Sequence, residues 1–278
     1  MTFLAGNSNF TTAVKHNSFR TLMAFTSLSS RWQDSVRKRL PMLEISALGH
    51  RFQVNPRDNH CEYTMWKYKR ITEPKSVSVL QNAVRGKRAL MYDLGANCDL
   101  FSVVIGKEIG DGSQVVCFEP NPEMATRLAK NISLNGMKDM ATIQQVALGS
   151  DDGEGTLSLA NKNLGHSASN NQVQVPIRPL SQFTDTSGSF QIVVLKIDIE
   201  GFEDRALIPF FANVDEQYWP QVVLIEVTSA FMWETNVVKT MQSLGYELTD
   251  TFEGNAILQN PSTAVTQPIQ NANSGRSH

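Results

Sequence analysis

The alternation of strand and helix patterns that begins at Ala89 constrains the fold more than any other feature. Residues 89–92 are apolar and stop at a glycine loop, residues 93–97, after which apolar positions in 100–105 predict a helix. Residues 114–118 predict a second strand, which ends at Glu119. Strands separated by single helices form βαβ units with parallel strands. We therefore predict an α/β fold: a doubly wound, mostly parallel sheet with helices on both faces.

The helix after Glu119 is signalled at both ends. Asn121 suits the N-cap, Pro122 suits the first helical position, and Gly136 suits a left-handed stop. Apolar side chains recur at helical spacing on one face: Met124, Leu128 and Ile132. A third strand is predicted over residues 142–147.

The second half of the chain predicts an insertion and two more buried strands. Residues 156–160 and 172–177 alternate and flank an Asn/Ser/Gly-rich loop, residues 161–171, which predicts an inserted hairpin at the sheet edge. The apolar runs 192–199 and 221–227 predict strands that are buried on both faces, each followed by a helix.

Charge and composition divide the chain into an arm, a main domain and a tail. Residues 1–43 carry six basic residues and one acid, which leaves 19 − 26 = −7 for the remainder. We predict a partly helical or disordered basic arm over 1–43, and a targeting peptide or membrane-surface contact stay open for it. The main domain spans 44–259 with an N-terminal hairpin and helical cap over 44–88, and the polar stretch 260–278 is expected to be a disordered tail.

Composition excludes several classes of protein. The net charge of −2 argues against a nucleic-acid binder that relies on phosphate contacts. Three cysteines without CxxC spacing and only five histidines argue against a structural metal site and favour a reducing, cytoplasmic location. No apolar run is long enough to predict a transmembrane segment.

The first two strand ends predict a nucleoside site. Glu119 follows Asp93 by 26 residues, and an acid at the tip of the second strand can accept both ribose hydroxyls. The loop nevertheless lacks the two later glycines of G-x-G-x-x-G, and Asp99 would repel a pyrophosphate at the helix N-terminus. These residues favour the cationic S-adenosylmethionine over a nicotinamide dinucleotide. Asp99 is equally explained as the N-cap of a helix that starts at Leu100.

Five stretches in order carry a resemblance to a known family: DLGANCDLFS, VVCFEPNPEMATRLAKNISLNG, VALGSDDGEGTLSLA, VVLKIDIEGFEDRAL and VVLIEV. The sequence resembles the FkbM-type S-adenosylmethionine-dependent methyltransferases over about residues 73–260. This resemblance implies a class I methyltransferase (Rossmann-like) fold. It also implies O-methylation of a hydroxyl on a sugar, glycan, polyketide or related metabolite. Asp99 stands where the family usually has Gly.

The resemblance also implies which residues hold the cofactor. Asp93 and Gly95 would contact the methionine amino group, Asn97 would shape the loop, and Glu119 would accept the ribose hydroxyls. The residues expected to line the adenine are apolar: Pro120, Val146 and Ala147.

The fourth strand ends in charges that alternate with apolar residues, namely Lys196, Asp198 and Glu200, so these charges share one face. Asp198 is the first candidate for a contact to the methionine moiety or the acceptor hydroxyl. Asp198, Glu200 and Glu226 are candidate general bases, and His166 is a lone loop histidine. The structural alternative is a Lys196–Asp198 ion pair with Glu200 at the start of the next helix.

Two other functions stay open beside a methyltransferase with a small-molecule or glycan acceptor. One is a non-catalytic S-adenosylmethionine or nucleoside-binding protein with a decayed site. The other is a nicotinamide-dependent oxidoreductase. The sequence leaves the acceptor and the oligomeric state open.

Overall fold

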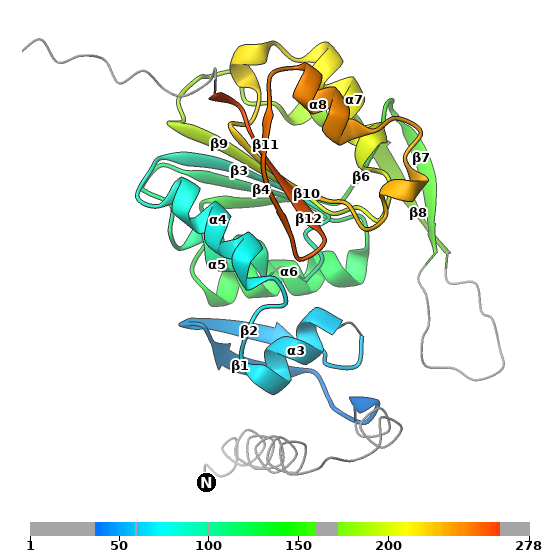
Figure 1. The fold of residues 1–278 in the computed structure, drawn as a ribbon. Coiled ribbons are helices and arrows are strands. Elements are labelled where there is room, and N and C mark those ends of the chain that lie inside the picture. Colours follow the sequence, from blue (N-terminus) through cyan, green and yellow to red (C-terminus); the bar gives the residue numbers. More distant parts are fainter. Residues whose placement is uncertain (1–36, 59, 99, 159–171, 262–278) are drawn as a thin grey trace, which may run out of the picture. The chain divides into compact units, whose positions relative to one another are not determined.

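The computed structural model describes residues 37–58, 60–98, 100–158 and 172–261 (Figure 1). Its described residues fall into two compact units, the first ending at Thr72 and the second starting at Glu73. The predicted arm up to residue 36, the predicted tail from residue 262, and both Asp99 and His166 lie outside the described residues.

The first unit contains a β-hairpin, β1 (Leu43–Ala47) and β2 (His50–Val54), and the helix α3 (His60–Tyr68). The predicted hairpin is confirmed: Ala47 pairs with His50, so residues 48 and 49 form the turn. The turn residues Leu48 and Gly49 both have positive φ, 54° and 77°. That geometry matches the twist of the flanking strands in a two-residue hairpin turn.

The second unit is built on a seven-stranded sheet. Its strands are β3 (Ala89–Leu94), β4 (Gln114–Phe118), β5 (Ala141–Gln144), β9 (Ile192–Ile197), β10 (Val222–Glu226), β11 (Glu247–Phe252) and β12 (Asn255–Gln259). They lie in the order β11-β12-β10-β9-β3-β4-β5. The pairs from β5 to β10 are parallel, whereas β12 is antiparallel to both of its neighbours.

Helices cover both faces of this sheet, as a doubly wound fold requires (Figure 1). One face carries α4 (Pro74–Val84), α5 (Phe101–Gly106) and α6 (Pro122–Leu134), and the other carries α7 (Glu203–Asn213) and α8 (Val237–Ser243). The predicted fold class is therefore confirmed.

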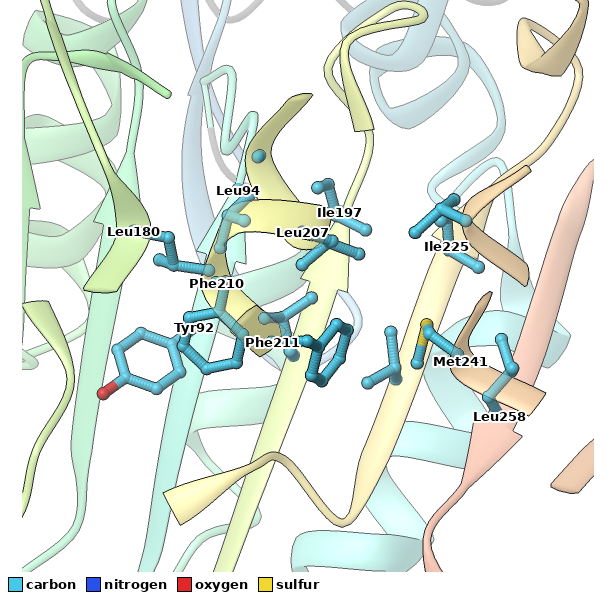
Figure 2. Packing of buried hydrophobic residues seen from close by; sticks show 14 of the residues in the cluster. Tyr92, Leu94, Leu180, Ile197, Leu207, Phe210, Phe211, Ile225, Met241 and Leu258 are labelled. Carbon is cyan, nitrogen blue, oxygen red and sulfur yellow. The ribbon is translucent and has the colours of Figure 1, made fainter. Parts of the chain in front are cut away.

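The main core lies between the sheet and α7 with α8. Figure 2 shows Tyr92, Ile197, Ile225 and Leu258 from four strands, with Phe210 of α7 packed on the same side. Each fully buried side chain of this size contributes about 1.5–3 kcal/mol of transfer free energy. This apolar face fixes the strand register, so the polar side chains that alternate with it must point to the α4–α5 face.

The caps predicted for α6 are confirmed. Asn121 Oδ1 accepts the backbone N–H groups of Glu123 at 2.9 Å and Met124 at 3.4 Å, and Pro122 is the first helical residue. Gly136 has a φ of 67°, the left-handed conformation that ends the helix.

The predicted third strand is too long at its carboxyl end. Pairing with β4 stops at Gln144, and residues 147–148 form β6 (Ala147–Leu148) in a separate sheet of order β6-β8-β7. Ala147 pairs there with Ile177, which pulls it out of the main sheet.

The predicted inserted hairpin is confirmed as β7 (Gly153–Ser158) and β8 (Gln172–Arg178). Three short 3-10 helices complete the unit: η1 (Leu180–Phe183), η2 (Glu216–Tyr218) and η3 (Ala230–Met232).

Candidate functional site

The site lies where the strand order reverses. β4 and β9 pair with opposite edges of β3, and ligands of such sheets bind beyond the carboxyl ends of the strands next to this point. Gly95 follows β3, Glu119 follows β4, and Asp198 follows β9. Because these strands are parallel, the three residues meet at one edge of the sheet. Three of the predicted site residues are therefore gathered there.

The loop after β3 is pressed against the backbone that follows β9. Gly95 has a φ of 78°, and a Cβ added to it would lie 1.9 Å from the carbonyl oxygen of Asp198. The backbone N–H groups of Gly95 and Ala96 both donate to the Phe118 carbonyl at 3.0 Å. Only glycine fits this position, and the loop is thereby fixed between two strand ends.

Glu119 has its carboxylate held by backbone amides. Its Oε2 accepts the N–H of Asn97 at 2.7 Å and its Oε1 accepts the N–H of Asn121 at 2.8 Å, and the residue is only 7% exposed. Burial raises its pKa above the usual glutamate value, although the two amides and Lys196 act in the opposite direction. Each oxygen retains a further lone pair, so the carboxylate can still accept two hydroxyls.

Asn97 shapes the loop through its own backbone conformation. It has a φ of 55°, which asparagine tolerates better than most residues, and its Oδ1 accepts the N–H of Cys98 at 2.7 Å. Asn131 of α6 donates to the Cys98 carbonyl at 2.8 Å. The loop is therefore braced from α6 as well as from the strands.

Asp93 is fully buried beneath this loop. Ser102 Oγ donates to its Oδ2 at 2.6 Å, and Lys196 Nζ lies 3.3 Å from its Oδ1. Lys196 also donates to the Gly95 carbonyl at 2.8 Å. Burial favours the neutral amine of Lys196, but Asp93 and then Asp198 outweigh it and hold the lysine pKa above its ordinary value. A direct contact between Asp93 and the methionine amino group stays a prediction.

The alternative prediction for this strand, an ion pair between Lys196 and Asp198, is wrong. Lys196 forms its ion pair with Asp93, while the half-buried Asp198 donates its backbone N–H to the Leu94 carbonyl at 3.0 Å. Glu200 does not start the next helix, because α7 begins at Glu203 and Glu200 is exposed in a turn with a φ of 57°. The catalytic roles of Asp198, Glu200 and Glu226 stay predictions.

Glu226, the last residue of β10, is half-buried at the same edge. Its Oε1 accepts the backbone N–H of Thr228 at 2.6 Å. Burial raises its pKa, the Thr228 N–H lowers it, and the neighbouring Asp198 charge raises it further. Asp198 and Glu226 thus form a pair of nearby carboxylates.

Sequence reasoning missed Glu73, which lies at the same edge. Glu73 immediately precedes α4 and accepts a hydrogen bond from Asn255 Nδ2 at 2.7 Å. Burial raises its pKa, and Asp198 and Lys196 are among the charges that act on it. No sequence signal links Glu73 to Asn255, because 182 residues separate them.

Glu203 was also missed as a site residue. It is fully buried; its Oε1 accepts the N–H groups of Ile199 at 2.9 Å and Gly201 at 3.2 Å, and its Oε2 accepts Trp233 Nε1 at 2.7 Å. It therefore joins the loops that follow β9 and β10. The sequence signal that could have indicated Glu203 is an acid directly after the Gly201–Phe202 pair.

The residues predicted to line the adenine follow β4 and β5. Pro120, Val146 and Ala147 are half-buried, and Val146 packs against the main core. Ala147 belongs to β6 rather than to the end of a third sheet strand. Their contact with adenine stays a prediction.

Two features are absent from the described residues. Within residues 37–58, 60–98, 100–158 and 172–261, no group of histidine, cysteine and acidic side chains is arranged to hold a metal ion. No helix in that part of the chain has the length and apolar character needed to cross a membrane.

Comparison with known proteins identifies the family. Residues 93–248, more than half of the chain, match the model of the methyltransferase FkbM domain. The chain belongs to this family. The resemblance first indicated by the five sequence stretches is confirmed, and the FkbM match covers the Gly95 loop, Glu119, Asp198 and Glu226. No curated protein matches the chain.

Three solved structures are similar to the FkbM chain. The FkbM methyltransferase from Methylobacillus flagellatus is 16% identical, with a TM-score of 0.42, over 61% of this chain and 42% of that one. TYW2 from M. jannaschii in complex with AdoMet is 13% identical, with a TM-score of 0.41, over 79% and 86%. The M. jannaschii tRNA m1G37 methyltransferase is 11% identical, with a TM-score of 0.39, over 78% and 52%. The chain thus spans about half the length of the first and third.

The fold is the class I methyltransferase fold, and the cofactor of this FkbM chain is S-adenosylmethionine. The residues present fit that cofactor. Glu119 retains lone pairs for ribose hydroxyls, and Asp198, Glu226 and Glu73 give the edge a negative charge that suits an amine and a sulfonium. A dinucleotide pyrophosphate would be repelled by the same carboxylates.

Proposed function

We propose that this protein is an S-adenosylmethionine-dependent O-methyltransferase that acts on a hydroxyl of a small molecule or glycan, such as a sugar or polyketide. One observation carries the proposal: carboxylates of the described residues gather at the strand reversal, with Glu119 oriented by two loop amides. This arrangement supports a nucleoside with a cationic substituent.

The cofactor supplies a methyl group on a sulfonium when it is bound. The chain's own residues then have three tasks. Glu119 accepts the ribose hydroxyls, Asp198 offsets positive charge, and a carboxylate takes the proton of the acceptor hydroxyl. Glu226 is one candidate base, because it ends β10 at the same edge of the sheet and burial raises its pKa above the ordinary glutamate value. Asp198 and Glu200 are the other candidates.

The experiment compares ligands and then turnover. We expect S-adenosylhomocysteine at one hundred times its Kd to raise the free energy of unfolding by about 2.7 kcal/mol, and therefore to raise Tm. NAD should leave Tm unchanged. Mass-spectrometric detection of S-adenosylhomocysteine formed from S-adenosylmethionine and a panel of hydroxylated small molecules then tests for catalysis. Stabilisation by NAD alone would support the oxidoreductase. Binding of S-adenosylmethionine without turnover on any acceptor would support a non-catalytic binding protein.

A further inference from the structure

Exposed apolar side chains gather in the two loops that begin at Asp198 and Glu226. Phe202 is 44% exposed, Phe231 is 86% exposed and Met232 is 47% exposed. We refer to these three side chains as the apolar patch. Scattered exposed apolar residues are normal, but three within two adjoining loops beside candidate catalytic carboxylates indicate a binding surface.

The two loops that carry the apolar patch have their backbones held in place by packing and hydrogen bonds. A Cβ added to Gly201 would lie 2.8 Å from Met232 Sδ, so the two loops are packed together. Glu203 bonds both loops, as described above, and Asp204 Oδ2 accepts the N–H groups of Glu234 at 2.8 Å and Thr235 at 3.1 Å. Both carboxylates are buried, and buried acids are costly unless they are hydrogen-bonded. These two acids hold the loops in a conformation that leaves Phe231 exposed.

The surroundings of the apolar patch are acidic. Segments 198–205 and 226–234 contain six acids and one base: Asp198, Glu200, Glu203, Asp204, Glu226, Glu234 and Arg205. Arg205 forms an ion pair with Glu234 at 2.9 Å and lies 4.8 Å from the centre of the Phe202 ring. A phosphate, an RNA backbone or an anionic lipid surface would meet repulsion here.

We propose that the apolar patch is the docking surface for the methyl acceptor and that it selects molecules without negative charge that have an apolar face next to a hydroxyl. This inference rests on the proposed function. The acceptor's apolar face packs on Phe231 and Phe202, and its hydroxyl donates to Asp198 or Glu226 at the start of the same loops. The negative charge rejects acceptors that are themselves anionic.

The test uses two probes that differ by one charge. Phenyl β-D-glucoside is uncharged, and phenyl β-D-glucuronide has the same rings with a carboxylate. Saturation-transfer NMR measures the binding of each to the wild type, Phe231→Ala and Phe202→Ala. The matched control is Leu248→Ala, because Leu248 is 42% exposed but lies on β11 outside both loops.

We expect the glucoside to bind the wild type and Leu248→Ala equally and each phenylalanine variant at least fivefold more weakly. The glucuronide should bind the wild type at least fivefold more weakly than the glucoside. Three results would overturn the proposal: no glucoside binding to the wild type, equal binding to Phe231→Ala, or a glucuronide that binds as well as the glucoside. Sedimentation with phosphatidylcholine or phosphatidylglycerol vesicles that is lost in Phe231→Ala would assign the patch to a membrane instead.

Calorimetry with S-adenosylhomocysteine separates this inference from the proposed function. Phe231→Ala should leave that affinity unchanged, since Phe231 is 86% exposed and belongs to the loop after β10. If the wild type binds the glucoside but not S-adenosylhomocysteine, the docking surface stands and the methyltransferase proposal fails. The reverse result would reject the docking surface alone.

Discussion

At the scale of single residues, Glu119 is oriented by the backbone alone. Replacing Glu119 by Ala should remove two charge-assisted hydrogen bonds to the ribose, each worth about 1.5–3 kcal/mol. We expect the affinity for S-adenosylhomocysteine, measured by calorimetry, to fall at least tenfold, which is about 1.4 kcal/mol. Glu154→Ala on β7 is the matched control, since it removes an exposed carboxylate elsewhere. Unchanged affinity in a folded Glu119→Ala protein would contradict the ribose assignment.

The raised pKa of Glu119 gives this affinity a pH dependence. The ionised carboxylate accepts hydroxyls better than the protonated acid, and burial places its pKa above the ordinary value of 4.5. The affinity should therefore be constant near neutral pH and fall as the pH drops through that raised pKa. Calorimetry from pH 7.5 down to the ordinary glutamate value of 4.5 measures the decline. The decline should be absent in Glu119→Ala; a wild-type profile that is flat over this whole range would count against the assignment.

At the scale of the elements, the N-terminus of α4 is capped by a residue from the β11–β12 hairpin. Glu253, in the turn between β11 and β12, accepts the backbone N–H of Ser76 at 3.0 Å and that of Lys75 at 3.1 Å. Ser76 Oγ also donates to it at 3.1 Å. No local side chain caps this helix, since Glu73 in the N-cap position makes no such bond. A carboxylate suits the position because the N-terminal amides and the helix dipole both favour negative charge.

Removing this cap should destabilise the fold modestly. We expect Glu253→Ala to lower the free energy of unfolding by about 1–2 kcal/mol, the range for a lost N-cap, or roughly 2–8 °C in Tm. Thermal denaturation followed by circular dichroism measures it. Glu247→Ala, on the exposed strand β11, should stay within about 0.5 kcal/mol of the wild type. Equal effects of the two substitutions would show that the Glu253 contacts do not stabilise the helix.

At the scale of the whole molecule, one buried ion pair links the two halves of the sheet. Asp93 belongs to β3 and Lys196 to β9, the strands on either side of the order reversal. Breaking a buried pair leaves an uncompensated charge, which is costlier than losing a half-buried carboxylate at the edge.

Two matched substitutions separate support from function. Asp93→Asn should cost about 3 kcal/mol and lower Tm by roughly 6 °C or more. Asp198→Asn should shift Tm by less than about 2 °C but reduce turnover per folded molecule. Differential scanning calorimetry and the turnover assay give the two readouts. A large Tm loss with normal turnover in Asp198→Asn would instead make Asp198 a structural residue.

Sequence reasoning succeeded where the determinants are local. The caps of α6 at Asn121 and Gly136 and the strand ends at Gly95 and Glu119 depend on neighbouring residues or on a short βαβ unit, and the parallel topology follows from them. The family resemblance added the cofactor.

Sequence reasoning failed where contacts are distant in sequence. The Glu73–Asn255 hydrogen bond joins residues that are 182 positions apart, so no local pattern predicts it. The Lys196–Asp198 ion pair, the structural alternative for this strand, is wrong for the same reason: alternation within one strand suggests Asp198 as the partner, whereas the register with β3 places Asp93 beside Lys196. The third strand was predicted to be too long, because Ala147 pairs with Ile177 of β8, 30 residues further along the chain.

The pairing of β3 with β9 also bears on how the molecule folds. Lys196 reaches the Gly95 carbonyl across 101 positions of chain, so the loop that receives the cofactor gains its support only after a long segment has closed. Closing such a segment is slow, because its entropy is lost before the contacts that compensate for it form. During refolding, the helix signal of α6 should therefore appear early, and the capacity to bind S-adenosylhomocysteine should appear only with the slowest phase.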